Sequence, residues 1–201
     1  MCNAPTEQRM HSKILFLLFF LLAAPSLMAQ TMRDILRQMP DTLVPLLTRN
    51  NLLDFPDYID SQMKAELSNR LTGTSEMLQL TDDYTVIQTS PASTIQLKLL
   101  PKGKAKIICL VRTYFANDSI GDSQFSFYTS EWKPMKASKM LALSREHNEF
   151  LQLRLFAADT HLEVVRRRPL DLRFEGDMSA PPAAVVNRFR WAGSKFVSMK
   201  P

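Results

Sequence analysis

The segment Lys106–Phe115 is apolar in both of its alternating sets of side chains, which strongly constrains the fold. One set is Ile107, Cys109, Val111 and Phe115, and the other is Ile108, Leu110 and Tyr114. Alternation of β-branched and aromatic residues is typical of a strand, and a strand that is apolar on both faces must be covered on both. We therefore predict that this segment is the central strand of a sheet. The flanking segments Ser93–Leu99 and Gln124–Tyr128 alternate apolar and polar residues and are predicted to be strands beside it.

The rest of the chain predicts helices and strands that cover or extend this sheet. Short helices are expected at 31–39, 42–47 and 54–71, and further strands at 76–80, 85–89, 162–166 and 170–174, with a closing hairpin at 189–197. Because short turns join neighbouring strands, antiparallel pairing is favoured. The predicted fold class is α+β, with N-terminal short helices packed on a mainly antiparallel β-sheet.

Several side chains predict how the helices begin and end. Thr31 and Asp34 are spaced as a capping box. In the third helix, Asp54 is the expected N-cap and Gly73 the expected left-handed residue after the last turn. The spacing of Asp60–Lys64 and Glu66–Arg70 predicts two ion pairs along that helix.

The segment Ser144–Ala158 fits two patterns. Phe150, Leu153 and Ala157 recur at helical spacing, whereas Leu151, Leu153 and Leu155 alternate with polar residues as in a strand. We favour a helix, because Ser144 suits a helix start. Helices followed by strands would then occur at 31–130 and again at 140–199, which suggests a degenerate α/β repeat.

The first 29 residues have the pattern of a secretory signal peptide. Arg9, His11 and Lys13 precede the apolar run Ile14–Ala24, and small residues follow it up to Ala29. The run is about half of the ~20 residues that a spanning helix needs. We predict cleavage after Ala29, a single α+β domain over 30–201, and a periplasmic or secreted mature chain that does not span a membrane.

Charge and cysteine content narrow the classes of function. Removal of residues 1–29 lowers the formal net charge from +5 to +4, a mild excess that does not predict a nucleic-acid partner. The only basic run, Arg166–Arg168, is predicted to lie on a solvated sheet edge. A charged groove for anionic lipid or polysaccharide is the alternative. Cys109 is the one cysteine of the mature chain, so no internal disulfide can form and the core must stabilise the domain.

Several short motifs together resemble a known family. They are Thr31-Met32-Arg33-Asp34, Met39-Pro40-Asp41, Leu46-Leu47-Thr48-Arg49-Asn50-Asn51, Asp60-Ser61-Gln62-Met63-Lys64-Ala65, Leu80-Thr81-Asp82-Asp83-Tyr84 and Trp191-Ala192-Gly193-Ser194-Lys195-Phe196. The chain resembles an exported family of Bacteroidales, domain of unknown function 3256, over nearly all of its mature length. This resemblance implies a periplasmic or outer-envelope location and carries no assigned activity. In that bacterial order, Asp-Ser/Thr-apolar triplets serve for periplasmic O-glycosylation, which implies Thr42 and Ser119 as possible glycan carriers.

The sequence contains no constellation that predicts a catalytic or metal site. The two mature histidines, His147 and His161, lie far apart, so no metal and no cofactor is expected. Cys109 lies mid-strand and is predicted to be a small apolar filler with a raised pKa. Asp82-Asp83 is predicted to form a turn. Glu76, Asp82, Asp83 and Glu131 flank strands and could form a glycosidase pair only if the fold brought two of them together.

Aromatic residues on or beside the predicted strands are the candidate contact residues. They are Tyr84, Tyr114, Tyr128, Trp132 and Trp191. Any that remain exposed would suit stacking on a sugar or contact with a protein, although core packing is the commoner role. The sequence therefore favours a non-catalytic binding or scaffolding domain for an envelope protein or glycan. The alternative is a glycan-directed hydrolase with carboxylates assembled by the fold.

Overall fold

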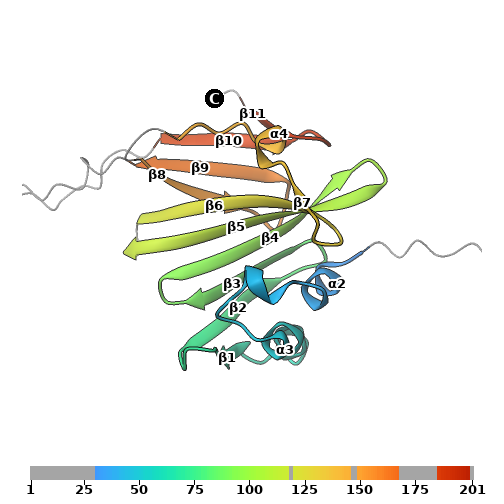
Figure 1. The fold of residues 1–201 in the computed structure, drawn as a ribbon, viewed down its shortest axis with the longest axis vertical. Coiled ribbons are helices and arrows are strands. Elements are labelled where there is room, and N and C mark those ends of the chain that lie inside the picture. Colours follow the sequence, from blue (N-terminus) through green and yellow to red (C-terminus); the bar gives the residue numbers. More distant parts are fainter. Residues whose placement is uncertain (1–29, 118–119, 146–148, 168–184, 200–201) are drawn as a thin grey trace, which may run out of the picture.

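The computed structural model describes residues 30–117, 120–145, 149–167 and 185–199, which form two antiparallel sheets and several short helices (Figure 1). The larger sheet has its strands in chain order: β1 (Glu66–Ser68), β2 (Thr74–Leu80), β3 (Tyr84–Ser90), β4 (Ser93–Lys102), β5 (Ala105–Asn117), β6 (Ile120–Thr129) and β7 (Pro134–Met135). The smaller sheet has the order β11-β10-β9-β8, formed by β8 (Phe150–Leu155), β9 (His161–Arg167), β10 (Val185–Trp191) and β11 (Phe196–Ser198). The helical elements are α2 (Met32–Arg37), the 3-10 turn η1 (Asp41–Leu43), α3 (Arg49–Asp60) and α4 (Ala137–Met140).

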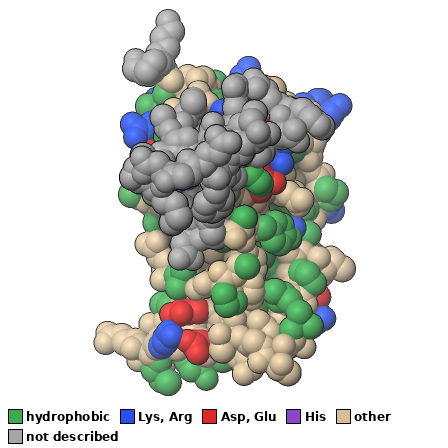
Figure 2. All heavy atoms as spheres, turned by 90° about the vertical axis from the view of Figure 1, so that its left-hand side faces the viewer, with side chains coloured by type: hydrophobic (Ala, Val, Ile, Leu, Met, Phe, Trp, Pro, Cys, Tyr) green, Lys and Arg blue, Asp and Glu red, His purple; other side chains and the backbone are tan. Residues whose placement is uncertain are grey.

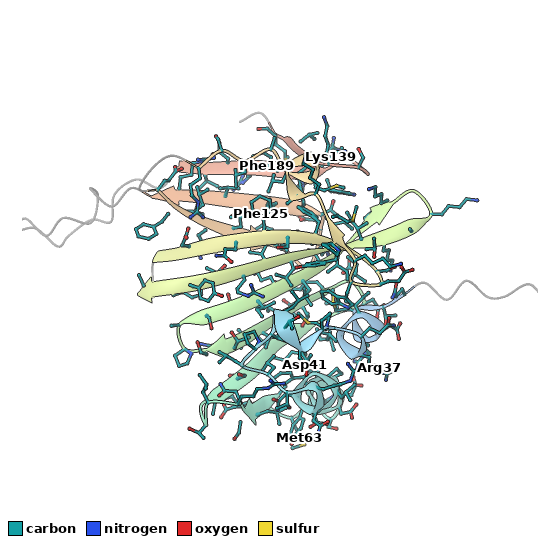
Figure 3. The ribbon with its side chains drawn as sticks, in the orientation of Figure 1. Arg37, Asp41, Met63, Phe125, Lys139 and Phe189 are labelled. Carbon is teal, nitrogen blue, oxygen red and sulfur yellow. The ribbon has the colours of Figure 1, made fainter. Side chains whose placement is uncertain are left out.

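Strand β5 lies between β4 and β6 and is covered on both faces, as predicted. Ile108 and Leu110 belong to a hydrophobic cluster with the buried sides of α2 and α3. Cys109 and Val111 belong to a second cluster with β8, β9, β10 and β11. Helices α2 and α3 thus cover one face of the seven-stranded sheet, and the four-stranded sheet with α4 covers the other, with side chains such as that of Phe125 lying between the sheets (Figure 3). The predicted α+β class with mainly antiparallel sheet is confirmed.

The N-terminal capping box forms as predicted, but the next two helices differ from expectation. Asp34 accepts hydrogen bonds from the Thr31 amide and hydroxyl at 3.0 and 2.8 Å, and the Thr31 hydroxyl caps α2 in return. The second helix is only the 3-10 turn η1. The third, α3, has Thr48 as its N-cap and Asn51 in a second capping box. Asn51 thus helps to begin α3.

Helix α3 also ends earlier than predicted, at Asp60, so the two expected ion pairs do not form along a helix. Lys64 instead pairs with Glu66 and Glu76, which strand pairing between β1 and β2 places opposite each other. The expected left-handed residue is also displaced: Thr72, with φ of 60°, takes the conformation predicted for Gly73. Residues 66–68 form strand β1 rather than continuing the helix, because as a strand they pair with β2 and extend the sheet.

The segment Ser144–Ala158 contains strand β8, so the helix that we favoured is wrong. Leu151, Leu153 and Leu155 are all buried in the cluster between the sheets, which is the alternating pattern of a strand. This alternation favours a strand over a helix only when a sheet face is available to cover the three leucines. Helices and strands therefore do not alternate as we expected in the second half, and the degenerate repeat stays a prediction.

The basic run does not lie on a sheet edge in its described part. Strand β9 pairs with both β8 and β10, so Arg166 and Arg167 occupy an interior strand. Arg166 forms an ion pair with Glu149 and donates to the Asn187 side chain, which assigns it to packing rather than to a polyanion groove. Arg168 and the predicted strand 170–174 lie outside the described residues.

The turns between neighbouring strands agree with the sequence. Gly103 in the β4–β5 turn and Gly193 in the closing β10–β11 hairpin both have positive φ, where an L side chain would be strained. The Asp82-Asp83 turn joins β2 and β3. Over the described part of the chain, no helix has the length and apolarity that a bilayer crossing requires. The predicted signal peptide, 1–29, lies outside the described residues.

Candidate functional site

The structure separates the five candidate aromatic residues into buried and exposed ones. Tyr84, Trp132 and Trp191 are buried, and Tyr128 is half-buried against Trp132 with ring centroids 5.5 Å apart. Tyr114 differs, because 49% of its surface is exposed. Only for Tyr114 does the structure leave a ring available for a partner.

The hydrogen bonds of the buried aromatic residues show that these side chains hold elements of the fold together. The Trp132 indole donates to the Ile35 carbonyl at 3.1 Å, which ties β6 and its following turn to α2. The Trp191 indole donates to the Pro101 carbonyl at 2.6 Å, which ties β10 to the β4–β5 hairpin. Burial raises the pKa of the Tyr84 phenol, although a hydrogen bond from the Gln96 amide opposes part of this shift. Each ring thus joins two elements of the fold.

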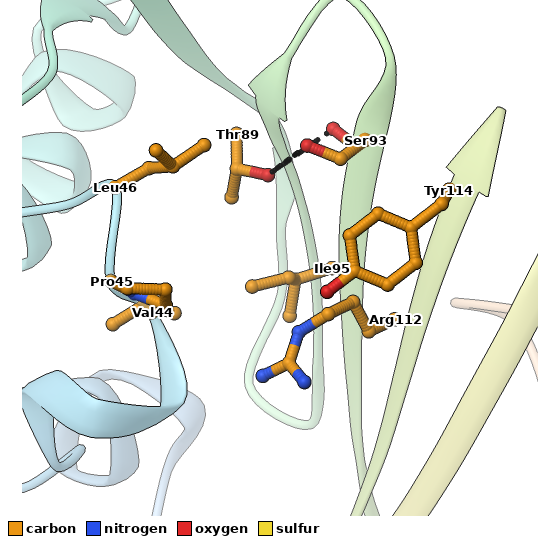
Figure 4. Close-up of a pocket in the computed structure, with 8 residues that line it drawn as sticks. All are labelled: Val44, Pro45, Leu46, Thr89, Ser93, Ile95, Arg112 and Tyr114. Atoms are coloured by element: carbon orange, nitrogen blue, oxygen red, sulfur yellow. Dashed lines mark hydrogen bonds between the residues drawn. The ribbon is translucent and has the colours of Figure 1, made fainter. Parts of the chain in front are cut away.

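Tyr114 stands at the edge of a cavity of about 250 Å³ that is closed by two different parts of the chain (Figure 4). Its lining residues are Val44, Pro45, Leu46, Thr89, Ser93, Ile95, Arg112 and Tyr114. We refer to it as the Arg112–Tyr114 pocket. Strand register brings its sheet residues together, since Ser93 lies opposite Tyr114 and Ile95 opposite Arg112. All four side chains therefore share the face of the sheet that the helices cover, beyond the end of the helical layer.

The other wall is the loop after η1, and several contacts hold it in place. Val44 and Leu47 are buried in the cluster under the helices. The Leu46 carbonyl accepts a hydrogen bond from the Arg70 amide at 2.9 Å, and the Arg112 guanidinium donates to the Leu43 carbonyl at 2.5 Å. The pocket is therefore bounded by anchored backbone on both sides.

Arg112 is a half-buried cation for which the described residues supply no carboxylate partner. Arg33, Arg70, Arg145, Arg166 and Arg188 each form an ion pair with an Asp or Glu. Arg37, Arg49, Arg154 and Arg190 form none with the described residues either, but unlike Arg112 they are exposed. Figure 4 shows the Arg112 guanidinium and the Tyr114 hydroxyl both directed from β5 toward the loop. A guanidinium that lacks an internal counter-charge can bind an anionic group with charge-assisted hydrogen bonds.

The hydroxyl groups at the back of the pocket are already paired with each other. The hydroxyl oxygens of Thr89 and Ser93 lie 2.8 Å apart (Figure 4). Those of Ser90 and Ser93 lie 2.7 Å apart. Thr89 is the extra residue of an irregularity in the pairing of β3 with β4, which turns it toward this network. The polar groups left for a ligand are those of Arg112 and Tyr114.

A second hollow, of about 300 Å³, lies on the opposite face of the same strands. Its floor includes Gln96 and Thr113, and its wall is the edge of β8. Both side chains already serve the fold: Gln96 accepts from the Leu155 amide at 3.0 Å, and Thr113 bonds to the Ser123 hydroxyl at 2.8 Å. This hollow is therefore built around the junction of the two sheets.

None of the candidate carboxylates of the sequence (Glu76, Asp82, Asp83 and Glu131) lines either of these two hollows. Glu76 lies beside Lys64, Asp83 pairs with Lys98 at 2.9 Å, and Glu131 pairs with Lys133 at 3.0 Å. Cys109 is fully buried as expected, and burial raises the pKa of its thiol far above the usual value. Within the residues that the structure describes, no three His, Cys, Asp or Glu side chains gather as a metal site would require.

Sequence reasoning missed Arg112, although the signal was present. In the set Ile108, Leu110, Arg112 and Tyr114, a charged residue interrupts an apolar face of the central strand. Such a position is either paired internally or faces a cavity. Of the candidate glycosylation sites, Thr42 is exposed on η1, and Ser119 lies outside the described residues.

The comparisons with known proteins agree with this picture of the fold. The sequence model of the family described as "Protein of unknown function (DUF3256)" matches residues 24–174. The chain belongs to this family. A solved domain of an uncharacterized protein from Porphyromonas gingivalis W83 is similar to the DUF3256 chain with a TM-score of 0.67 and 19% sequence identity, and the match covers 86% of this chain and 100% of that one. The likeness shows a shared fold. A search of curated proteins found no match.

Proposed function

We propose that the mature chain is a non-catalytic binding domain of the bacterial envelope, which holds a protein or glycan partner at the Arg112–Tyr114 pocket. The observation that carries this proposal is the half-buried guanidinium of Arg112 beside the exposed ring of Tyr114. A cation and an aromatic ring together provide both a charged contact and a large apolar contact, as in the energetic centres of many interfaces.

The surroundings of the pocket support a contact surface. The β3–β4 turn and the end of β5 reach the side of the molecule seen in Figure 2, where hydrophobic side chains gather across the middle of the face. Pro45 is exposed and Leu46 half-buried in the loop beside Tyr114. Apolar surface grouped around a polar anchor is typical of sites that bind a partner.

The alternative function is a glycan-directed hydrolase. Cleavage of a glycosidic bond generally requires two carboxylates on either side of that bond. The described side chains that line the Arg112–Tyr114 pocket include no Asp or Glu. They do include a cation, Arg112, and an aromatic ring, Tyr114, which can both contact a bound partner. The geometry therefore supports binding better, and a hydrolysis assay on any retained glycan separates the two functions.

Export is part of the proposal. The signal-peptide pattern predicts Gln30 as the first mature residue, and the Gln30 carbonyl accepts a hydrogen bond from Lys106 at 2.9 Å while its side-chain amide donates to Ser130 at 3.4 Å. N-terminal sequencing of the native protein should begin at Gln30. Intact mass on the same sample tests glycan at Thr42 and Ser119, since a mass equal to that of the polypeptide would reject it.

The binding function is tested by capture from an envelope extract with quantitative mass spectrometry. The mature protein should retain one partner stoichiometrically, and Tyr114→Ala should lower its recovery by about tenfold or more, as expected for a central interface residue. Met63→Ala is the matched control, because Met63 is an exposed apolar residue in the turn that follows α3 and does not line the pocket (Figure 3). Equal recovery with all three proteins would reject the pocket as the contact site.

A further inference from the structure

We propose that the group entering the Arg112–Tyr114 pocket is the carboxyl-terminal residue of a peptide, with its carboxylate on Arg112 and its apolar side chain against the loop. This inference rests on the proposed binding function and names its ligand. It is drawn from the charge of the pocket, the apolar character of its walls and its size.

The positive charge of Arg112 favours an anionic ligand in the pocket. Arg112 uses one N–H donor on the Leu43 carbonyl, and no carboxylate among the described residues reaches the guanidinium. The planar fork of an arginine matches a carboxylate in a two-point contact, which gives direction as well as attraction. The Tyr114 hydroxyl, directed to the same side, can donate to the same carboxylate (Figure 4).

The walls call for an aliphatic group beside that anion. Val44, Pro45, Leu46 and Ile95 supply apolar surface around the guanidinium. The Thr89 and Ser93 hydroxyls, which could otherwise recognise a sugar, bond to each other. A uronic acid would satisfy Arg112 but would place its hydroxyl groups against apolar side chains, where they would lose hydrogen bonds to water.

The size of the pocket favours a single C-terminal residue as the ligand. A volume of about 250 Å³ lies just below the roughly 300–1,000 Å³ typical of pockets for whole small ligands. One residue that carries both a carboxylate and an apolar side chain fits this volume. A C-terminal residue combines them, whereas an internal acidic residue needs an apolar neighbour as well.

The test is fluorescence anisotropy with the mature protein and labelled hexapeptides that differ only at the last residue. A peptide that ends in free leucine should bind about tenfold or more tightly than the same peptide with an amidated end, since a charged hydrogen-bonded contact is lost. Arg112→Gln should bind both peptides with the same weak affinity. Arg112→Lys should recover part of the preference for the free carboxylate, because it keeps the charge but not the fork.

The matched control is Arg49→Gln, since Arg49 also donates to a backbone carbonyl, that of Arg37 at 2.7 Å, but does not line the pocket. It should bind as the natural protein does, and thermal melts check that each variant is folded. Equal affinity for the acid and amide peptides would overturn the inference. Binding of a glucuronic-acid disaccharide without binding of either peptide would also overturn it, while leaving the proposed function in place. The proposed binding function is tested separately: it would be rejected if Tyr114→Ala captured the same partner from the extract as the mature protein does.

Discussion

At the residue scale, Lys98 places a charged group between the two sheets. Its side chain is 2% exposed, and its ammonium group bonds to the Asp83 carboxylate and to the Ala157 carbonyl, both at 2.9 Å. Lys98 also lies over the Tyr84 ring at 5.9 Å. It therefore joins β4 to the turn before β3 and to the chain after β8.

Truncation of Lys98 should destabilise the domain more than an apolar replacement of similar length. We expect Lys98→Ala to lower the free energy of unfolding by about 2–4 kcal/mol through the cavity and the unpaired Ala157 carbonyl. Asp83 is 42% exposed, so water can solvate its carboxylate and limits the cost. Lys98→Met should cost about 1–2 kcal/mol, since it keeps most of the packing. Urea titrations measure both, and equal values for the two variants would contradict this account.

Asp34 gives the domain one identified pH-dependent contribution. Hydrogen bonds from the Thr31 amide and hydroxyl lower the pKa of the Asp34 carboxyl below its usual value. A lowered folded-state pKa means that the stabilisation is present above the unfolded pKa of about 3.9 and is lost as the pH falls through the folded value. Asp34→Ala should cost about 0.5–1 kcal/mol at pH 7. In urea titrations that cost should shrink below pH 4, and a constant difference from pH 7 to pH 3 would reject the assignment.

Single residues mark where sequence reasoning reaches its limit. Lys98 alternates with Ile95, Leu97 and Leu99 as a polar strand residue should, and only the second sheet reveals that its face is buried. Tyr114 was a candidate from sequence, but so were four other aromatic residues that prove to be partly or fully buried. Exposure depends on which elements cover a strand, and the covering elements come from distant parts of the chain.

At the scale of elements, strand β8 is joined to the larger sheet through its free edge. The amides of Leu151, Leu153 and Leu155 point away from β9 and donate to side chains of Asp122, Ser123 and Gln96 at 3.1, 2.9 and 3.0 Å. These acceptors come from β6 and β4. An edge strand otherwise leaves such amides open to pairing with another chain, so the side chains both satisfy and protect it.

Removal of the central acceptor should weaken this junction. Ser123→Ala leaves the Leu153 amide and the Thr113 hydroxyl without their buried partner, which should cost about 1–3 kcal/mol in urea titrations. Ser126→Ala is the control, since Ser126 is a half-buried residue of the same strand whose side chain forms no hydrogen bond with the described residues. It should cost under about 0.5 kcal/mol. Equal effects of the two changes would show that the β8 edge does not depend on Ser123.

Element boundaries were predictable where the signal is local and strong. The Thr31–Asp34 capping box, the hairpin glycines and the strands of the central block follow from residues within a few positions of one another. The end of helix α3 and the strand β8 were not predicted correctly. The local pattern continued the helix beyond Asp60, and the pattern of Ser144–Ala158 fitted both a helix and a strand. Pairing of β1 with β2 and burial of β8 on the larger sheet determine the observed structure, and both contacts are tertiary.

At the scale of the whole molecule, β5 contributes to both hydrophobic clusters, so the helical layer and the smaller sheet share one strand. The described residues should therefore unfold cooperatively. The two tryptophans report on the two clusters, Trp132 on the helical side and Trp191 on the side of the smaller sheet. In Trp132→Phe and in Trp191→Phe, the urea transition seen by the remaining tryptophan should coincide with that seen by far-UV circular dichroism. Separate transitions within either variant would indicate two independently folding parts.

The central claim is that the Arg112–Tyr114 pocket faces a partner in the envelope, and site-specific photo-crosslinking in intact cells tests it most directly. The photoreactive residue p-benzoylphenylalanine replaces Tyr114, or Met63 as the control, in the otherwise natural protein. We predict a light-dependent adduct of defined mass from position 114 alone, which Arg112→Gln abolishes. The same adducts from both positions, or none from position 114, would contradict the account.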